Sequence, residues 1–418
     1  MKAKIIVVGP ALSMSGYGVQ TRFALKALQK HEDKFDVYLR NTKWGQTGEL
    51  WEDTEERRYL VGLLQKTEVH LRQPNQHFDV SLQVTIPNEF QKIAMVNIGY
   101  TAGIETSKIA PEWIEKCDMM DKIITISQHS QNVLVDTVYE LTDQNQNKHV
   151  LKVSTPVDYV NYGHVEIEPE ELDLSLEYDD NFLVVSQFGP RKNLLNTISW
   201  FVEAFRTQEV GLVVKTFGRR NSNADFEQLS KELSVLMDNL GEKTCQVILL
   251  HGSLTSGQMK SLYRHPKLSG FVNLAHGEGF GLPMFEAACE GLPVIAPFWS
   301  GQCDFLSMPV KAKKKTKIKA MIAKVSFDIG RVQPEAVWNG VIHKDSAWCY
   351  PQKSSYIDRL KDVLKNKNRY VSQAKKLQTY LLENFKEEDR LDEFAESVLD
   401  TKGVKQMTDQ NALEGMFL

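Results

Sequence analysis

A short segment in the second half of the chain constrains the fold most strongly. Residues 270–274 form an apolar, strand-like run, and a glycine-rich turn follows it. Residues 283–290 then have the character of a helix, and residues 292–296 are again strand-like. This order of strand, turn, helix and strand predicts an α/β domain in which a turn at the carboxyl edge of a parallel sheet meets a ligand.

The turn itself has the composition of a phosphate-binding loop. Gly277, Gly279 and Gly281 lack a Cβ atom, so the backbone can bend and a ligand can approach it closely. Pro283 suits the first turn of a helix, because its missing N–H needs no partner there. The free N–H groups and the positive end of such a helix favour a phosphate.

Two carboxylates accompany the turn. Glu278 lies within it, and Glu286 follows in the helix-like run. An ionised carboxylate only accepts hydrogen bonds, so it suits hydroxyl groups such as those of a ribose or a hexose. The alternative interpretation is a chance glycine turn inside an ordinary α/β domain.

The run Glu278–Pro283, with Glu286 and residues 291–296 after it, resembles the E-x7-E signature of retaining glycosyltransferases of family four, which have the GT-B fold. The resemblance implies an α/β protein of two Rossmann-like domains with a cleft between them and a C-terminal helix that crosses back. It implies that Glu278, a predicted catalytic residue, orients hydroxyls of the donor sugar and that Glu286 holds the ribose. The remaining donor-binding residues implied in the second domain are His251, Gly252, His276, Gly279, Phe280, Gly281, Leu282 and Gly301, the last through its backbone N–H.

A second element of the resemblance follows the strand-like run 181–186. Lys192 stands where relatives carry a lysine that grips the donor diphosphate, whereas Gln187 occupies the place of their arginine. Arg191 is adjacent and is expected to supply the missing charge. We therefore predict that Lys192 and Arg191 act in catalysis by stabilising the leaving phosphate. The alternative is an exposed lysine at the start of a helix.

The first half of the chain holds weaker candidates. Gly16, Tyr17 and Gly18 follow the strand-like run 4–8 but match neither the dinucleotide fingerprint nor a P-loop. Relatives carry a glycine-rich loop here that faces the sugar diphosphate and the acceptor, so these residues are predicted to bind the donor; the alternative is a flexible first turn. Glu105 is predicted to be a catalytic residue that holds a hydroxyl of the donor or the acceptor, and the alternative is a solvated loop carboxylate.

The chain has 418 residues, which favours two domains. Strand-like runs, among them 150–153, alternate with helical stretches, among them 256–263, and predict mostly parallel sheets. We predict an N-terminal Rossmann-like acceptor-side domain over residues 1–165 and an acidic linker over 166–180. A C-terminal Rossmann-like domain that binds the nucleotide-sugar is predicted over 181–385, and a crossover helix and tail over 386–418.

The composition indicates which partners and which cellular location to expect. The net charge is −4 and the pI about 6.2, so the chain as a whole is not attracted to nucleic acid or to membranes. The five cysteines show no C-x-x-C pair and no zinc spacing, as expected of reduced thiols. The sequence shows neither a signal-peptide pattern nor a membrane-spanning run. It therefore predicts a cytoplasmic protein, located in the host cytoplasm if it comes from a bacteriophage.

One dense basic cluster interrupts the family pattern. It consists of Lys311, Lys313, Lys314, Lys315, Lys317 and Lys319. One interpretation is a solvated loop or an edge strand protected by lysines. The other is a contact with a polyanion, either a DNA backbone or an acidic glycan.

Together these features predict a retaining, metal-independent transferase that moves a sugar from a UDP- or GDP-sugar to a hydroxyl acceptor. No metal or other cofactor is expected, since the chain has no Asp-x-Asp element. Glycan, lipid-linked, protein and small-molecule acceptors stay open. Residues 299–306 also resemble a bacteriophage branch, so a hydroxymethylated base in phage DNA is an alternative acceptor. A sugar-nucleotide epimerase, a phosphorylase, and a module that binds carbohydrate or nucleotide without catalysis are rival functions.

Overall fold

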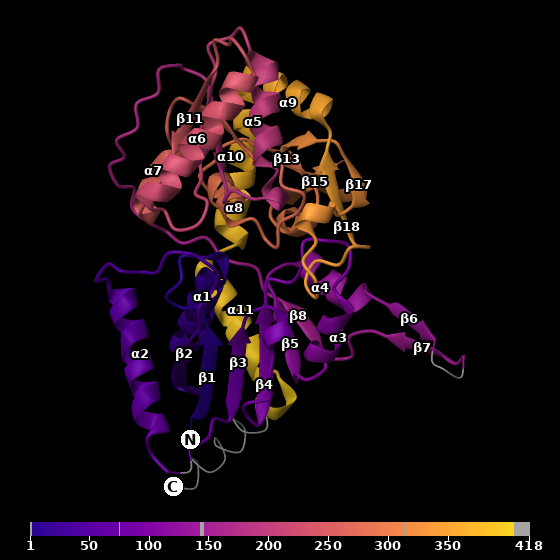
Figure 1. Cartoon of the computed structure of the whole chain (residues 1–418). Helices are drawn as coiled ribbons and strands as arrows, with labels where there is room; N and C mark the ends of the chain where they lie inside the picture. The colour runs from indigo at the N-terminus through magenta and orange to yellow at the C-terminus, as the bar shows by residue number, and fades with distance from the viewer. Residues whose placement is uncertain (1, 75, 143–145, 313–314, 405–418) are drawn as a thin grey trace. The chain divides into compact units, whose positions relative to one another are not determined.

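The alternating strands and helices build two separate parallel sheets. The computed structural model describes residues 2–74, 76–142, 146–312 and 315–404. The chain divides into two units (Figure 1). The first consists of Met1–Gly163, Val337–Ser346 and Glu387–Leu418, and the second of His164–Ala336 and Ala347–Lys386.

The first unit is built on a six-stranded sheet of order β2-β1-β3-β4-β5-β8, in which every pairing is parallel. Its strands are β1 (Ala3–Gly9), β2 (Phe35–Asn41), β3 (Val80–Val84), β4 (Val96–Thr101), β5 (Lys122–Thr125) and β8 (Val157–Tyr159). Its helices are α1 (Gly16–Lys30), α2 (Glu55–Leu71), α3 (Pro111–Cys117), α4 (Gln128–Asp136) and α11 (Glu387–Leu399), with the short 3-10 turn η1 (Pro87–Glu89). The central strands are apolar along most of their length because helices cover the sheet.

The second unit repeats this design with the order β11-β10-β9-β12-β13-β16, again all parallel. Its sheet strands are β9 (Asn181–Val185), β10 (Gly211–Lys215), β11 (Gln246–Leu250), β12 (Leu268–Val272), β13 (Val294–Pro297) and β16 (Ala323–Val325). Its helices are α5 (Leu194–Phe205), α6 (Asn223–Asn239), α7 (Ser256–Tyr263), α8 (Leu282–Cys289), α9 (Lys353–Lys365) and α10 (Lys367–Asn384). Its 3-10 turns are η2 (Pro190–Lys192), η3 (Ser300–Asp304) and η4 (Pro334–Ala336).

In the part of the chain that the structure describes, three antiparallel strand pairs lie outside these sheets. They are β6 (Tyr139–Thr142) with β7 (Lys148–Leu151) in the first unit, and β14 (Ser307–Ala312) with β15 (Lys315–Ala320) and β17 (Phe327–Arg331) with β18 (Ala347–Pro351) in the second. The prediction of a sheet strand at 150–153 is therefore wrong. Residues 148–151 pair across a hairpin with β6, and Val153, which follows β7, is buried in the core of the first unit.

The helix α11 belongs to the first unit although it follows the second in sequence, which confirms the predicted crossover helix. Phe394 is fully buried, and its ring centroid lies 5.7 Å from that of Phe23 and 4.7 Å from that of Tyr100. Lys122 Nζ donates to the carbonyl of Ser397 at 2.8 Å. Aromatic packing and this buried ammonium group thus hold the helix on the first sheet.

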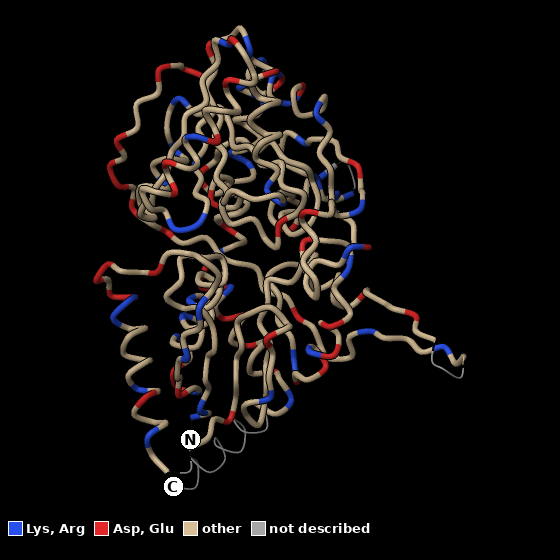
Figure 2. The backbone as a smooth tube through the Cα atoms, in the orientation of Figure 1, with Lys and Arg blue, Asp and Glu red and all other residues tan. Residues whose placement is uncertain are grey.

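The acidic stretch 166–180 has no helix or strand of its own and lies in the second unit, where red segments of the backbone trace in Figure 2 mark Asp and Glu residues. Thr255 Oγ1 donates to Glu170 at 2.6 Å, and Lys260 Nζ donates to the carbonyl of Ile167 at 2.5 Å. The stretch is therefore attached to α7. Among the described residues, no helix is long and apolar enough to cross a membrane.

Candidate functional site

The candidate site of the second unit lies where the strand order reverses. β9 is the first strand of this unit, and β10 and β12 pair with its two sides. In open α/β sheets, ligands bind at such a switch point, outside the carboxyl ends of the strands. The loop after β9 carries Arg191 and Lys192, and the loop after β12 carries Glu278. The topology thus brings together three residues that are far apart in sequence.

These three residues form a charge cluster in which the carboxylate is buried and the two cations are partly exposed. Lys192 Nζ lies 2.6 Å from Glu278 Oε1 and 2.7 Å from Oε2, and Arg191 Nη1 lies 3.2 Å from Oε2. Asn273 Nδ2 donates to Oε1 at 3.2 Å. Glu278 is only 6% exposed. Burial opposes ionisation, but the charges of Lys192 and Arg191 outweigh it and lower the pKa of Glu278 to about 2.

The two loops are also joined through their backbones. Arg191 Nη1 donates to the carbonyl of Gly277 at 2.7 Å, and the N–H of His276 donates to the carbonyl of Arg191 at 2.9 Å. Asn193 adopts a left-handed conformation with φ 53°, and its Nδ2 donates to the carbonyl of Leu274 at 3.2 Å. The cations are therefore held in place before any ligand binds.

Ser300 and Gly301 form hydrogen bonds with the turn at Glu278. The N–H of Glu278 donates to Ser300 Oγ at 2.9 Å, and the N–H of Gly301 donates to the carbonyl of Glu278 at 3.0 Å. A Cβ atom on Gly301 would lie 2.0 Å from the carbonyl oxygen of Gly279. The prediction that Gly301 offers its N–H to a phosphate is therefore wrong, because that N–H serves the loop; the glycine is needed for close backbone packing.

The start of α8 has the predicted form. Gly281 adopts φ +99°, a region that favours glycine, and Pro283 occupies the first turn. Phe280 is buried, and its ring packs edge to face on Phe285 at 5.3 Å. Leu282 is the first helical residue. In this part of the predicted donor site, Gly279–Leu282 shape the turn chiefly through their backbone.

His276 has a buried structural position. Its Nδ1 donates to the carbonyl of Cys349 at 2.7 Å, and its ring stacks on Trp348 at 5.0 Å. Burial lowers the pKa of His276, so the ring is neutral at pH 7. These contacts hold β18 against the turn, and the donor contact of His276 stays a prediction.

Glu286 is placed differently from Glu278. Its Oε2 accepts a hydrogen bond of 2.8 Å from the Tyr263 hydroxyl, and Glu286 is exposed. Burial of the carboxyl group on its protein side raises the pKa of Glu286 to about 7; the bond from Tyr263 opposes this rise, and the charge of Glu290 adds to it. The exposed side leaves the carboxyl group within reach of a ligand hydroxyl.

The turn after β11 contains the predicted residues His251 and Gly252. His251 Nε2 lies 2.9 Å from Asp225 Oδ2, and both side chains are largely buried. Gly252 adopts φ +97°, and its carbonyl accepts a hydrogen bond from the buried ammonium group of Lys215. Burial lowers the pKa of Lys215. The contacts with Asp225 and Lys215 thus hold the turn in place.

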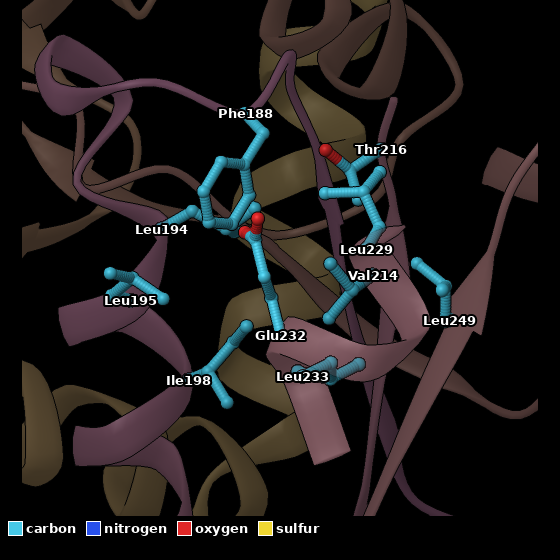
Figure 3. A pocket seen from close by; sticks show the side chains of 10 residues that line it. All are labelled: Phe188, Leu194, Leu195, Ile198, Val214, Thr216, Leu229, Glu232, Leu233 and Leu249. Carbon is cyan, nitrogen blue, oxygen red and sulfur yellow. The ribbon is translucent and has the colours of Figure 1, made fainter. Parts of the chain in front are cut away.

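An apolar pocket lies nearby in the same unit, between α5, α6 and the strands β10 and β11 (Figure 3). Among its ten labelled side chains, only Thr216 and Glu232 carry oxygen atoms. Its enclosed volume of about 20 Å³ has room for little more than a water molecule. It is therefore too small to hold a sugar nucleotide.

In the first unit, Gly16, Tyr17 and Gly18 form the first turn of α1. Tyr17 Oη lies 3.0 Å from Thr101 Oγ1, and the N–H of Ala102 donates to it at 3.2 Å. A Cβ atom on Gly18 would lie 1.9 Å from the carbonyl oxygen of Ser13, whereas one on Gly16 would meet nothing within 4 Å. Only Gly18 is required for packing.

Glu105 lies in the loop after β4 and is half-buried. Burial raises the pKa of Tyr17, and the charge of Glu105 adds to this effect, so the two side chains share one environment. The predicted residues therefore fall into two groups, one at the carboxyl edge of each sheet. Asn273 and Ser300, which form hydrogen bonds with Glu278, were not predicted. The only signal for them in the sequence is that each is a polar residue next to a predicted element, Asn273 at the end of β12 and Ser300 before Gly301.

The basic cluster forms the hairpin of β14 and β15. Lys311, Lys315, Lys317 and Lys319 are exposed on it. Lys313 and Lys314 lie outside the described residues. The described part of the cluster is therefore an exposed two-stranded ribbon, and it contributes no residue to the charge cluster of Glu278.

Three comparisons relate this architecture to known proteins. Residues 256–393 match the model of a family described as GT4-conflict, "Family 4 Glycosyltransferase in conflict systems". The matched stretch begins at α7 and contains the whole turn around Glu278. No curated protein sequence matches the chain.

Several solved structures share the fold. Sucrose-phosphate synthase from Thermosynechococcus elongatus has a TM-score of 0.61 and 13% identity, over 95% of this chain and 98% of its own. HepE from Anabaena, in complex with UDP and glucose, has a TM-score of 0.57 and 12% identity, over 95% and 99% of the two chains. The lipopolysaccharide outer core galactosyltransferase WaaB has a TM-score of 0.52 and 14% identity, over 95% and 99%.

At these identities the likeness establishes the fold, which is GT-B. The family match adds the segment that carries Glu278 and Glu286. The two sheets therefore give the chain the GT-B fold, and residues 256–393 are similar to a family-four glycosyltransferase model.

Proposed function

We propose that the chain transfers a sugar from a UDP-sugar to a hydroxyl acceptor with retention of configuration. One observation carries this proposal: Arg191 and Lys192 surround the buried Glu278 at the switch point of the second sheet. With Glu278 ionised, the cluster has a net charge of +1, which suits a diphosphate. UDP is the first nucleotide to test because HepE has been solved with UDP and with UDP-glucose.

The cations act on the charge that develops in the reaction. The bond from the anomeric carbon to the terminal phosphate oxygen breaks, and its electron pair stays on UDP. Lys192, Arg191 and the positive end of α8 stabilise that charge. The acceptor hydroxyl forms the new bond to the anomeric carbon and gives its proton to the leaving phosphate, as the family resemblance implies. No side chain is needed as a general base.

Glu278 contributes by positioning the cations. Both of its oxygens already accept hydrogen bonds from Lys192, Arg191 and Asn273. It therefore differs from the sequence-based expectation of a residue that binds sugar hydroxyls. Glu286, which is exposed and accepts a hydrogen bond from Tyr263 on one oxygen, suits the ribose.

In the first unit, the first turn of α1, from Gly16 to Gly18, and the loop residue Glu105 are proposed to contact the substrates. Tyr17 joins this turn to the end of β4, where Thr101 and Ala102 bind its hydroxyl. Metal independence is part of the proposal, because two fixed cations can take the charge-stabilising role that a metal ion has elsewhere. A cytoplasmic location also stays a prediction; the chain's five cysteines are free thiols.

The decisive experiment measures donor binding and turnover together. Thermal shift with UDP and GDP reports which nucleotide stabilises the protein. Turnover of the UDP-sugar, with NMR detection of the released or transferred sugar, reports the anomeric configuration, and addition of EDTA tests for a metal. We expect stabilisation by UDP, a retained anomer and no effect of EDTA.

Lys192→Ala is expected to lose both UDP binding and turnover, while Lys361→Ala, an exposed lysine on α9, keeps both. Binding of UDP without turnover of any UDP-sugar would favour a binding module without catalytic activity. An inverted product would contradict the proposed retention.

A further inference from the structure

The hairpin of β14 and β15 is a two-stranded ribbon that is not part of the six-stranded sheet. Its register runs from Ser307 opposite Ala320 to Ala312 opposite Lys315. Every residue from Lys315 to Lys319 is exposed. The ribbon is thus free to meet a partner.

The register places three lysines of the ribbon on one face. Side chains two apart on a strand point to the same side, so Lys315, Lys317 and Lys319 form a row with charges about 7 Å apart. On that face, Met308 and Val310 are the cross-strand neighbours of Lys319 and Lys317. No ion pair joins any of the three lysines to another described residue.

The positive charge of this row is not balanced by acidic residues of the same segment. Residues 307–320 contain six lysines and no acidic residue, although the whole chain has a net charge of −4. One or two lysines protect an edge strand from pairing. Three on a single face repel one another, and an external polyanion would remove that repulsion.

We propose that this ribbon binds the phosphate backbone of duplex nucleic acid. A two-stranded ribbon fits the major groove of DNA, and lysines beside it neutralise phosphates without reading the sequence. The segment 307–320 has no aromatic, amide or acidic side chain that would stack on bases or bind sugar hydroxyls. These absences favour a duplex backbone over single strands and over acidic polysaccharides.

Binding by the ribbon does not depend on the donor site. A further claim, that the bound duplex accepts the sugar, does rest on the proposed function. In that case the lysine row determines where the acceptor lies, and the transferred sugar is attached to a hydroxyl group of the nucleic acid.

The test measures the affinity of the whole chain for a short fluorescent DNA duplex by anisotropy at several salt concentrations. Three phosphate contacts predict a slope of about −2.7 for log K against log salt, or about forty-fold weaker binding between roughly 50 and 200 mM salt. The variant Lys315→Gln/Lys317→Gln/Lys319→Gln should lose most of that slope. A matched control, Lys361→Gln/Lys375→Gln/Lys376→Gln, removes the same charge from exposed sites on α9 and α10 and should retain it.

Several outcomes would overturn the proposal. They are no binding at low salt, equal loss in both triple variants, and binding of heparin but not of DNA. Stabilisation by UDP, measured on each variant, shows that the second unit is folded. Loss of UDP binding with intact DNA binding would contradict the donor assignment and leave the ribbon proposal standing. Loss of DNA binding with intact UDP binding in the wild type would contradict only the proposal that the ribbon binds DNA.

Discussion

Lys192 and the buried Glu278 form an ion pair in which one ammonium nitrogen lies 2.6 Å and 2.7 Å from the two carboxylate oxygens. Arg191 adds a second cation to the same carboxylate. A carboxylate bound in this way has little capacity left for a ligand. The pair therefore fixes two positive charges in a geometry that a diphosphate can use.

The first prediction concerns the role of Glu278. If it positions the cations, Glu278→Gln should change the affinities for UDP and for the UDP-sugar by the same factor, because the sugar makes no contact with it. Isothermal titration with both ligands measures the two factors. A loss confined to the UDP-sugar would instead show that Glu278 binds sugar hydroxyls. Glu232→Gln, at an exposed site on α6, is the control.

The second prediction concerns stability and pH. The pKa of Glu278 is lowered from 4.5 to about 2, so its ionised form stabilises the native state above about pH 4.5. That contribution, on the order of 3 kcal/mol for a shift of this size, fades as the pH falls from 4.5 towards 2. Denaturant unfolding followed by tryptophan fluorescence should show Glu278→Gln less stable than the wild type at pH 7. The difference should shrink near pH 3; a difference that is constant with pH would contradict the lowered pKa.

The third prediction concerns donor binding near neutral pH. The pKa of Glu286 is raised to about 7, so the carboxyl group is ionised above that pH and protonated below it. Only the ionised form accepts hydrogen bonds from two ribose hydroxyls. The KM for the donor should therefore rise as the pH falls from 8 to 6, and Glu286→Gln should have a high and flat profile. Tyr263→Phe removes a bond that lowers this pKa, so it should move the transition to higher pH.

The fourth prediction concerns backbone packing beneath the turn. In Gly301→Ala, the new Cβ atom would lie 2.0 Å from the carbonyl oxygen of Gly279, and a backbone contact cannot move aside cheaply. We expect a loss of about 3 kcal/mol or more of unfolding free energy, together with a loss of UDP binding. Gly189→Ala is the control, because a Cβ atom there meets nothing within 4 Å and its backbone is extended. Equal stability of both variants would contradict the packing argument.

The fifth prediction concerns the crossover helix. Phe394 is fully buried against Phe23 and Tyr100, so Phe394→Ala should cost about 3–5 kcal/mol in the first unit. Limited proteolysis should then cleave near α11 much faster than in the wild type. Glu396→Ala, an exposed change on the same helix, should leave the rate unaltered. Unchanged proteolysis of Phe394→Ala would show that α11 is held by other contacts.

Local patterns predicted much of this architecture. The helix predicted at 256–263 has those bounds in the structure, and the segment 270–296 folds as strand, turn, helix and strand. Such features depend on side-chain periodicity and on glycine and proline at fixed positions, which a sequence displays directly. The prediction of a sheet strand at 150–153 failed because Val150 and Leu151 pair in the hairpin with β6, whereas Val153 follows β7 and joins the core outside any strand.

The sequence by itself determined the residue types of the site: two adjacent cations, two carboxylates and a glycine turn before a helix. Only the tertiary structure decided how they act on one another. It buried Glu278 between Lys192 and Arg191, left Glu286 exposed beside Tyr263, and directed the N–H of Gly301 into the loop. The reason is that the charge state and free hydrogen-bonding capacity of a group depend on its neighbours in space, and parallel strands bring those neighbours from distant parts of the chain.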